Sequence, residues 1–164
     1  MALIKLNNQS ISAVTALPSS IDVGKVLQVV NVQKDSSFNT TSSSPTDYGL
    51  TCSITPSSSS NYIILNVALG GVRIEGSTYM RAWVYKQING GGYSAHDQIE
   101  AGFGYSGSTL IKTMNLVKML KISPNTTSQV DFKIYVASAN GSNPVRITVD
   151  GVESSTLTAY EIKG

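Results

Sequence analysis

The sequence predicts an all-β protein, a jelly-roll-like antiparallel β-sandwich. Short segments alternate apolar and polar residues, as half-buried strands do, and no segment holds a persistent 3.6-residue period. Clusters of Ser, Gly, Asn and Pro separate these segments at the spacing of strand connections. Such a succession of short strands is typical of sandwiches and jelly rolls. A chain of 164 residues suits one domain with a substantial core.

Four strands are expected in the first half of the chain. The segments 47–54 and 61–69 place apolar residues at alternate positions, and between them lie Pro56 and four consecutive serines. Proline cannot donate to a strand ladder, and serine hydroxyls bond their own backbone, so this stretch is expected to form a loop. The four predicted strands are 25–34 ("KVLQVVNVQK"), 47–54, 61–69 and 78–88 ("TYMRAWVYKQI").

Five further strands are expected in the second half. Segment 129–137 ("QVDFKIYVA") alternates cleanly and predicts one buried and one wet face. Segment 110–122 ("LIKTMNLVKMLKI") is ambiguous, because Leu110, Met114 and Val117 could also share one face of a helix. A strand is favoured there, since no clear helix cap flanks the segment. The five predicted strands are 99–105, 110–122, 129–137, 144–150 and 156–162.

The strand at 78–88 has large buryable side chains on both faces, whereas a sandwich strand normally has one wet face. Met80, Ala82 and Val84 occupy one face. This pattern suggests a second buried surface, most simply a contact between subunits, and the alternative is a central strand covered by a loop. The candidate interface residues on the other face are Tyr79, Arg81, Trp83 and Tyr85.

The composition argues against several partners. Ser and Thr supply 38 residues, charged residues only 13%, and the formal net charge is +2. The one lysine cluster, Lys112, Lys118 and Lys121, is too small for a nucleic-acid footprint. No apolar stretch approaches the roughly 18 residues of a membrane span, and residues 1–20 lack a signal-peptide core. We therefore expect no nucleic acid, no membrane insertion, and synthesis in a cytoplasm.

The residues that carry catalytic chemistry are sparse. The only histidine, His96, has Ser94 and Asp97 close by, but three near neighbours in a glycine-rich loop cannot adopt triad geometry. The single cysteine, Cys52, lies on the inward face of its predicted strand, which indicates a buried thiol, and it excludes a disulfide within the chain. One His and one Cys do not make a zinc site, and no carboxylate pair stands out. We expect no enzymatic activity, no metal and no cofactor.

Several segments together resemble a known class of proteins. They are "GKVLQVVNVQ", "DYGLTCSITPSSSSNYIILNV", "SPNTTSQVDFKIYVAS", "STLTAYEIKG" and the leader "MALIKLNNQSISAVTALPSS". In this order they resemble small tail-fibre or fibre-like virion proteins of tailed bacteriophages, especially of marine or cyanobacterial hosts. The resemblance covers most of residues 1–164 and includes no catalytic motif.

The resemblance implies a virion protein, made in the cytoplasm of a bacterial host. Residues 1–24 would form a leader that docks to other virion proteins, and residues 25–164 a β-sandwich head assembled as a homotrimer. Tyr79, Trp83 and Tyr85 could then line a threefold interface. The head would bind a host-surface glycan or protein through its loops. The candidate receptor contacts are Asn89, Tyr93, His96 and Asp97 in the loop "NGGGYSAHD".

Three functional classes remain open from the sequence. The first is a host-recognition module of the tail, a tail fibre or fibre tip. The second is a capsid decoration, cement or head-fibre protein that stabilises the shell, a role that the absence of heptads and collagen-like triplets leaves open. The third is a glycan depolymerase, which would need a paired-carboxylate cleft that the sequence does not reveal.

Overall fold

The computed structural model describes residues 24–105, 111–148 and 153–164, and the regular elements of this part are all strands joined in antiparallel pairs. The prediction of an all-β antiparallel sandwich is therefore confirmed. Within the described residues, no helix is long and apolar enough to cross a membrane. The strands are β1 (Val26–Lys34), β2 (Phe38–Thr40), β3 (Thr46–Ile54), β4 (Tyr62–Glu75), β5 (Thr78–Ile88), β6 (Ser94–Tyr105), β7 (Ile111–Ile122), β8 (Val130–Ser138), β9 (Val145–Ile147) and β10 (Ser155–Ile162).

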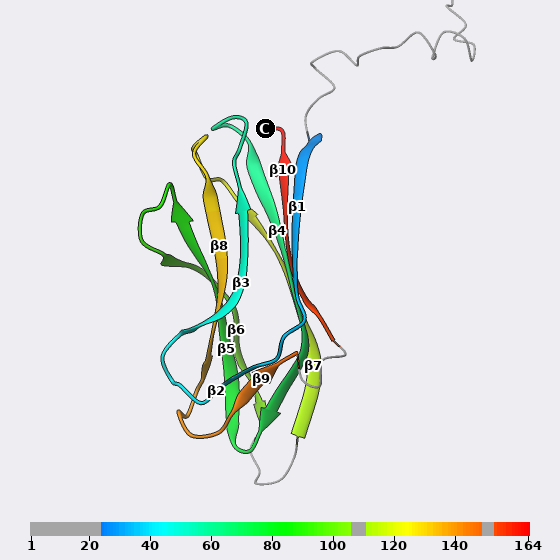
Figure 1. Cartoon of the computed structure of the whole chain (residues 1–164), viewed down its shortest axis with the longest axis vertical. Coiled ribbons are helices and arrows are strands. Elements are labelled where there is room, and N and C mark those ends of the chain that lie inside the picture. Colours follow the sequence, from blue (N-terminus) through cyan, green and yellow to red (C-terminus); the bar gives the residue numbers. More distant parts are fainter. Residues whose placement is uncertain (1–23, 106–110, 149–152) are drawn as a thin grey trace, which may run out of the picture.

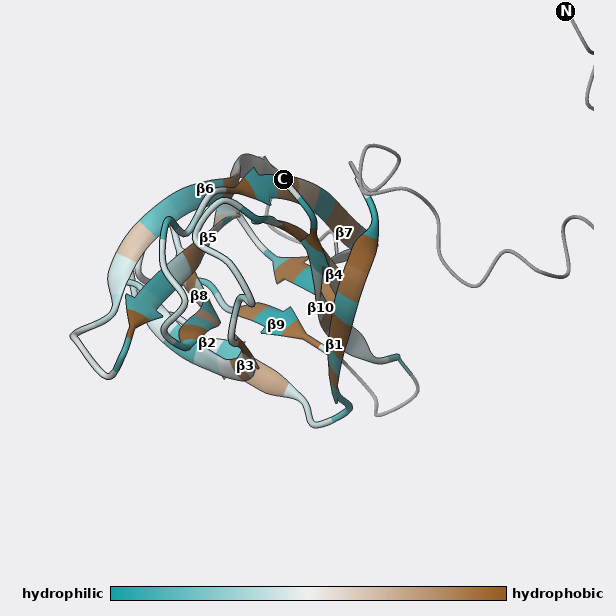
Figure 2. Ribbon diagram, turned by 90° about the horizontal axis from the view of Figure 1, so that it is seen from above, coloured by the Kyte–Doolittle hydropathy of each residue, from teal (hydrophilic) through white to brown (hydrophobic). Residues whose placement is uncertain are grey.

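The strands form two layers that face each other (Figure 1). One layer is a six-stranded sheet of order β1-β10-β4-β9-β2, in which β7 also pairs with β4. The other is a four-stranded sheet of order β3-β8-β5-β6. Seen along the strands, the two sheets curve around the space between them (Figure 2), and their inward side chains fill that space as one core.

Strand alternation sets the core, as the sequence predicts. On β8, Phe132 and Ile134 point inward and are fully buried, while Asp131 and Lys133 between them are partly exposed. Cys52 on β3 is also fully buried, and its Sγ lies 3.8 Å from the carbonyl oxygen of Val30 on the facing sheet. Burial raises the pKa of the Cys52 thiol to about 11. The expected buried thiol is confirmed.

The segment that is ambiguous between helix and strand in the sequence forms strand β7 over its described residues 111–122, and it pairs with β4 from Ile63 to Glu75. This pairing requires β4 to continue past residue 69, where the sequence-based strand ended. β4 passes through Gly70 and Gly71 with a register shift between Leu69 and Val72. A side chain at Gly70 would place a Cβ 2.3 Å from the carbonyl oxygen of Ser154, so glycine permits this close approach.

Three other boundaries differ from the sequence-based ones. β6 begins at Ser94 rather than residue 99, and β9 is limited to three residues. The short strand β2 lies in a Ser/Thr-rich stretch expected to be loop, and its pairing with β9 supplies the hydrogen bonds. The leader predicted at 1–24 falls outside the described residues except for Gly24.

The serine loop between β3 and β4 encloses a buried carboxylate, that of Glu161 on β10, which is 1% exposed. Its Oε1 accepts hydrogen bonds from the backbone N–H of Ser57 at 2.6 Å, the Ser57 hydroxyl at 2.7 Å and the Asn61 amide at 2.6 Å, and its Oε2 accepts one from Gln28 at 2.8 Å. Burial raises the pKa of Glu161, but the bonds from Asn61, Ser57 and Gln28 outweigh it, so the pKa lies below its ordinary value. The hydroxyl-rich loop thus ties β3 and β4 to β10 and β1.

Candidate functional site

The outer face of the four-stranded sheet carries a row of aromatic side chains along β5. Met80, Ala82 and Val84 point into the core and are fully buried. The residues between them point away from the core and stay partly exposed, because no other layer of the described chain covers this side of the sheet. These residues are Tyr79, Arg81, Trp83 and Tyr85, the set predicted from the sequence to line a subunit interface.

β8 extends this row sideways with Tyr135 and Lys133. Trp83 lies opposite Tyr135, and Tyr85 lies opposite Lys133, in the antiparallel register of β5 and β8. The rings of Tyr85 and Tyr135 stack, with centroids 4.0 Å apart and an angle of 28° between the planes. A stacked pair held by two neighbouring strands has little freedom to lose when a ligand or partner covers it.

Tyr93, at the entry to β6, joins the same face through Lys133. The Lys133 Nζ lies 4.7 Å from the centroid of the Tyr93 ring and 2.9 Å from Oδ2 of Asp47 on β3. The hydrogen bond to Asp47 is the main reason that the pKa of Lys133 is raised. Burial and the negative charge of Asp131 raise the pKa of Tyr93, so its hydroxyl stays protonated at neutral pH.

At the other end of the row, Arg81 covers Tyr79. The Arg81 Nη2 donates a hydrogen bond of 2.8 Å to the Tyr79 hydroxyl, and the guanidinium carbon is 5.2 Å from the ring centroid. The face therefore has aromatic surface in its middle and a basic group near each end. We name it the aromatic face, defined by Tyr79, Arg81, Trp83, Tyr85, Tyr93, Lys133 and Tyr135.

The predicted receptor loop does not gather its four residues at one place. Register shifts in the β5–β6 pairing, including one between Val84 and Tyr85, interrupt the alternation after Tyr93. As a result Asp97 lies opposite the inward-facing Val84 and 3.9 Å from Lys118 of the six-stranded sheet. Of the four, only Tyr93 has a contact on the aromatic face.

The other two loop residues lie apart from Tyr93. Asn89 is in a turn with a positive φ of 50°, and its backbone N–H donates to the carbonyl of Gln129. His96 lies at the surface, where partial loss of water around its ring, together with the positive charge of Lys86, lowers its pKa. Neither is joined to a second candidate contact by a hydrogen bond or ion pair in the described structure.

Sequence reasoning missed Lys133, Tyr135 and Asp47 as members of a site. Part of this site could have been found from the sequence, because Asp131, Lys133 and Tyr135 occupy every second position of segment 129–137, on the side expected to face solvent. Only the pairing of β8 with both β5 and β3 places them against Tyr85 and Asp47.

Potential metal ligands do not gather in the described residues. No group of three or more His, Cys, Asp or Glu side chains in this part of the chain could hold a metal ion. Asp47, a carboxylate beside the aromatic face, is paired with Lys133. Aromatic rings combined with guanidinium, ammonium and hydroxyl groups suit non-covalent binding, since Tyr, Trp and Arg bury large areas and keep polar atoms for hydrogen bonds.

Comparison with known proteins finds only distant structural matches. No protein-family model and no curated protein sequence matches the chain. Two solved structures of infectious bursal disease virus, from the Gx and Gt strains, match it at 15% and 13% identity, each with a TM-score of 0.38 and 84% of this chain covered. A mutant VP2 protein of the same virus, in derived T=1 particles, matches at 13% identity with a TM-score of 0.35 over 83% of this chain. The matches span 37%, 38% and 36% of those chains. Similarity this low carries no information on function.

Proposed function

We propose that this chain is a non-enzymatic structural protein of a tailed-bacteriophage virion, a tail-fibre or fibre-tip module, which binds the host cell surface through the aromatic face. The resemblance of its segments to phage fibre-like proteins supports the virion part of the proposal. The observation that carries the binding part is the row of half-exposed rings and cationic groups on a rigid sheet.

The chemistry of the aromatic face suits a glycan or a protein on the host surface. Trp83, Tyr85 and Tyr135 offer flat apolar surface, and the Tyr93 hydroxyl and the Arg81 guanidinium offer hydrogen bonds beside it. Because strands fix these rings, little side-chain entropy is lost on binding. The centre of the proposed receptor site is therefore the outer face of the four-stranded sheet and not the loop at 89–97. Tyr93 belongs to both the loop and the aromatic face.

The test is adsorption of the purified protein to host cells. Trp83→Ala should weaken binding by about tenfold or more, the loss expected when a central aromatic anchor is truncated. Ile88→Ala is the control, because Ile88 is an exposed apolar residue at the end of the same strand β5 and is not part of the aromatic face. Equal binding by wild type and a correctly folded Trp83→Ala protein would overturn the proposal.

The same residues are also the predicted lining of a threefold interface, and the trimer implied by the resemblance stays a prediction. Light scattering separates the two uses of the face. If Tyr79, Trp83 and Tyr85 are buried between subunits, Trp83→Ala should lower the molar mass in solution. If they bind a receptor, the mass should stay unchanged while adsorption falls.

A capsid decoration, cement or head-fibre protein is the second candidate. The observation that favours it is the set of exposed apolar side chains on β1 and β7 of the six-stranded sheet, because exposed apolar patches often mark contacts with other proteins. Antibody labelling of particles that carry this chain would separate the two, because label on the tail supports host attachment and label on the shell supports decoration.

A further inference from the structure

Two arginines lie side by side on the outer face of the six-stranded sheet, where β4 pairs with β9. Arg73 on β4 is directly opposite Arg146 on β9 in the antiparallel register. Like charges placed directly opposite each other on two strands destabilise a sheet. The pair therefore needs negative charge close to it.

The bulge in β4 brings Arg73 to this face. Before the bulge, the odd-numbered residues Val67 and Leu69 point into the core and are fully buried. The register shift between Leu69 and Val72 reverses the order, so that Val72 and Ile74 point inward and Arg73 points outward. Bulges often re-aim a side chain in this way at a functional position.

The carboxylate of Glu75 lies near both guanidinium groups. Its Oε1 is 3.1 Å from Nε of Arg73, and its Oε2 is 3.6 Å from Nη2 of Arg146. The first contact is an ion pair whose angle is not that of a hydrogen bond, and the second is too long to be a hydrogen bond. Two guanidinium groups against one carboxylate leave this cluster with a net positive charge.

The two guanidinium groups keep donors for a further partner. The Nε of each is buried and has no hydrogen-bond partner within the described residues, which is costly for a donor. Each group carries five N–H donors in a fixed fork. Asn39 on β2, opposite Arg146, adds an exposed amide to the same row. Because the Arg73 and Arg146 side chains remain 24% and 39% exposed, a ligand from solution can reach them.

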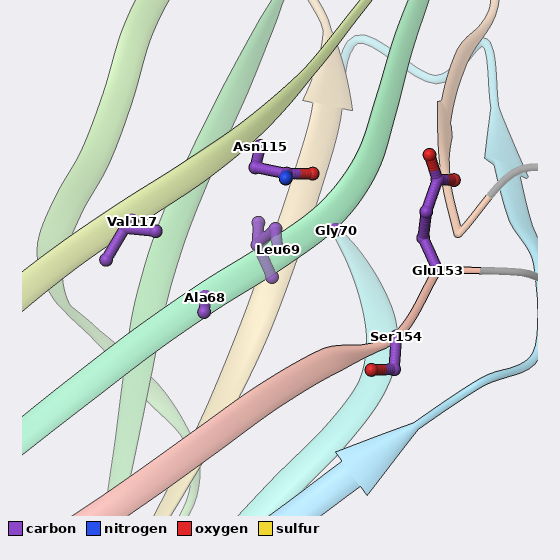
Figure 3. Close-up of a pocket in the computed structure, with 7 residues that line it drawn as sticks. All are labelled: Ala68, Leu69, Gly70, Asn115, Val117, Glu153 and Ser154. Carbon is purple, nitrogen blue, oxygen red and sulfur yellow. The ribbon is translucent and has the colours of Figure 1, made fainter.

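The pocket on the other side of the bulge has a different chemistry. It has a volume of about 310 Å³ and lies where β4 bends beside Gly70 (Figure 3). Ala68, Leu69 and Val117 give it an apolar lining, and the charged residue that lines it is Glu153. A carboxylate at that place repels anions. The groups that attract an anion are therefore those of the row beyond the bulge.

We infer that Arg73 and Arg146 bind a tetrahedral oxyanion, a phosphate or sulfate group, with the Asn39 amide beside it. A carboxylate has two oxygens, which suit one guanidinium fork, whereas a phosphate or sulfate has enough oxygens to accept from two forks at once. Such an anion also supplies the negative charge that Glu75 alone does not. The inference does not rest on the proposed function, because the row lies on the other sheet.

The test is an NMR titration of the arginine Nε–H signals in the full-length protein. Arg73, Arg81 and Arg146 are the three arginines of the sequence, so three signals are expected. When sodium phosphate is added at constant ionic strength, the signals of Arg73 and Arg146 should shift together along one saturable curve. Arg81 is the internal control, because it lies on the four-stranded sheet and its Nη2 donates to the Tyr79 hydroxyl.

Variants distinguish a binding site from an internal ion-pair cluster. Arg73→Gln and Arg146→Gln should each weaken phosphate binding by about tenfold or more, because hydrogen bonds to a charged ligand are lost. Glu75→Gln should strengthen binding severalfold, since it removes a competing negative charge. Arg146→Lys keeps the positive charge but loses the fork, so it should bind severalfold more weakly than wild type at an unchanged melting temperature.

A second titration distinguishes a free ion from the same group on a polysaccharide. Saturable shifts of Arg73 and Arg146 with phosphate alone indicate a free anion. Shifts with short dextran sulfate and not with phosphate indicate a group carried by a polymer, and both results support the inference. No saturable shift with either anion, an equal shift of Arg81, an equal effect of uncharged dextran, or wild-type binding by folded Arg146→Lys would overturn it.

Discussion

Replacing Glu161 by Gln should destabilise the fold strongly at neutral pH, because the serine loop is built around its carboxylate. The carboxylate accepts four hydrogen bonds, at 2.6 to 2.8 Å, from Ser57, Asn61 and Gln28. Bonds to a charged group contribute about 1.5–3 kcal/mol each and neutral ones about 1 kcal/mol. In the Glu161→Gln protein the negative charge is lost, and the new amide N–H₂ faces groups that are themselves donors. Together these changes should lower the free energy of unfolding by roughly 2–4 kcal/mol.

The effect should depend on pH with a definite sign. The pKa of folded Glu161 lies below its ordinary value, so the carboxylate stabilises the fold above the unfolded pKa, about 4.3. That stabilisation is lost as the pH falls through the folded pKa. The difference in unfolding free energy between wild type and Glu161→Gln should therefore be full at pH 7 and shrink steadily below pH 4.3.

Urea unfolding followed by tryptophan fluorescence, through the single Trp83, measures both effects. For a chain of this length, the predicted loss corresponds to a fall of roughly 5–15 °C in melting temperature. Glu75→Gln is the control, because Glu75 pairs with Arg73 and Arg146 at a partly exposed site and should cost less than about 1 kcal/mol. A Glu161→Gln protein within about 0.5 kcal/mol of wild type at pH 7, or an equal difference at pH 3, would refute the reasoning.

Three further predictions concern single residues. Cys52 should not react with a soluble thiol reagent at pH 8 in the folded protein, because the thiol is buried and its pKa is about 11. It should react once urea unfolds the chain. Rapid labelling of the native protein would contradict this prediction. Gly70→Ala should destabilise by about 1–3 kcal/mol or more, since its Cβ would lie 2.3 Å from the Ser154 oxygen, while Gly92→Ala, with open space around it, should change the melting temperature little. Tyr93→Ala should weaken host adsorption without lowering thermal stability, and normal adsorption would remove Tyr93 from the binding site.

Much of the local structure is predictable because it depends on neighbouring residues. Side chains on a strand alternate between faces, so the residues of 129–137 and 78–88 reveal their inward sets without any knowledge of the partners. The same alternation places Cys52 in the core, and its burial is confirmed. The ambiguous segment 110–122 is resolved correctly as a strand because its flanks offer no helix cap.

The candidate site was only half predictable. Tyr79, Arg81, Trp83 and Tyr85 share a face by local alternation, and the sequence found them together. The loop residues Tyr93 and Asp97 are separated because register shifts between β5 and β6 interrupt that alternation. The loop sequence gives no indication of these register shifts.

The β class, the position of most strands and the buried side of each strand can be read from the residues alone, because a two-residue period is a property of adjacent residues. The tertiary structure alone decided which strands are neighbours, and so which exposed side chains form one surface. Tyr135 meets Tyr85, Glu161 meets Ser57, and Val29 shares a face with Met119 only through pairings between segments far apart in the chain. Such pairings depend on the packing of the whole sandwich, in which each strand satisfies its hydrogen bonds and buries its apolar side at once.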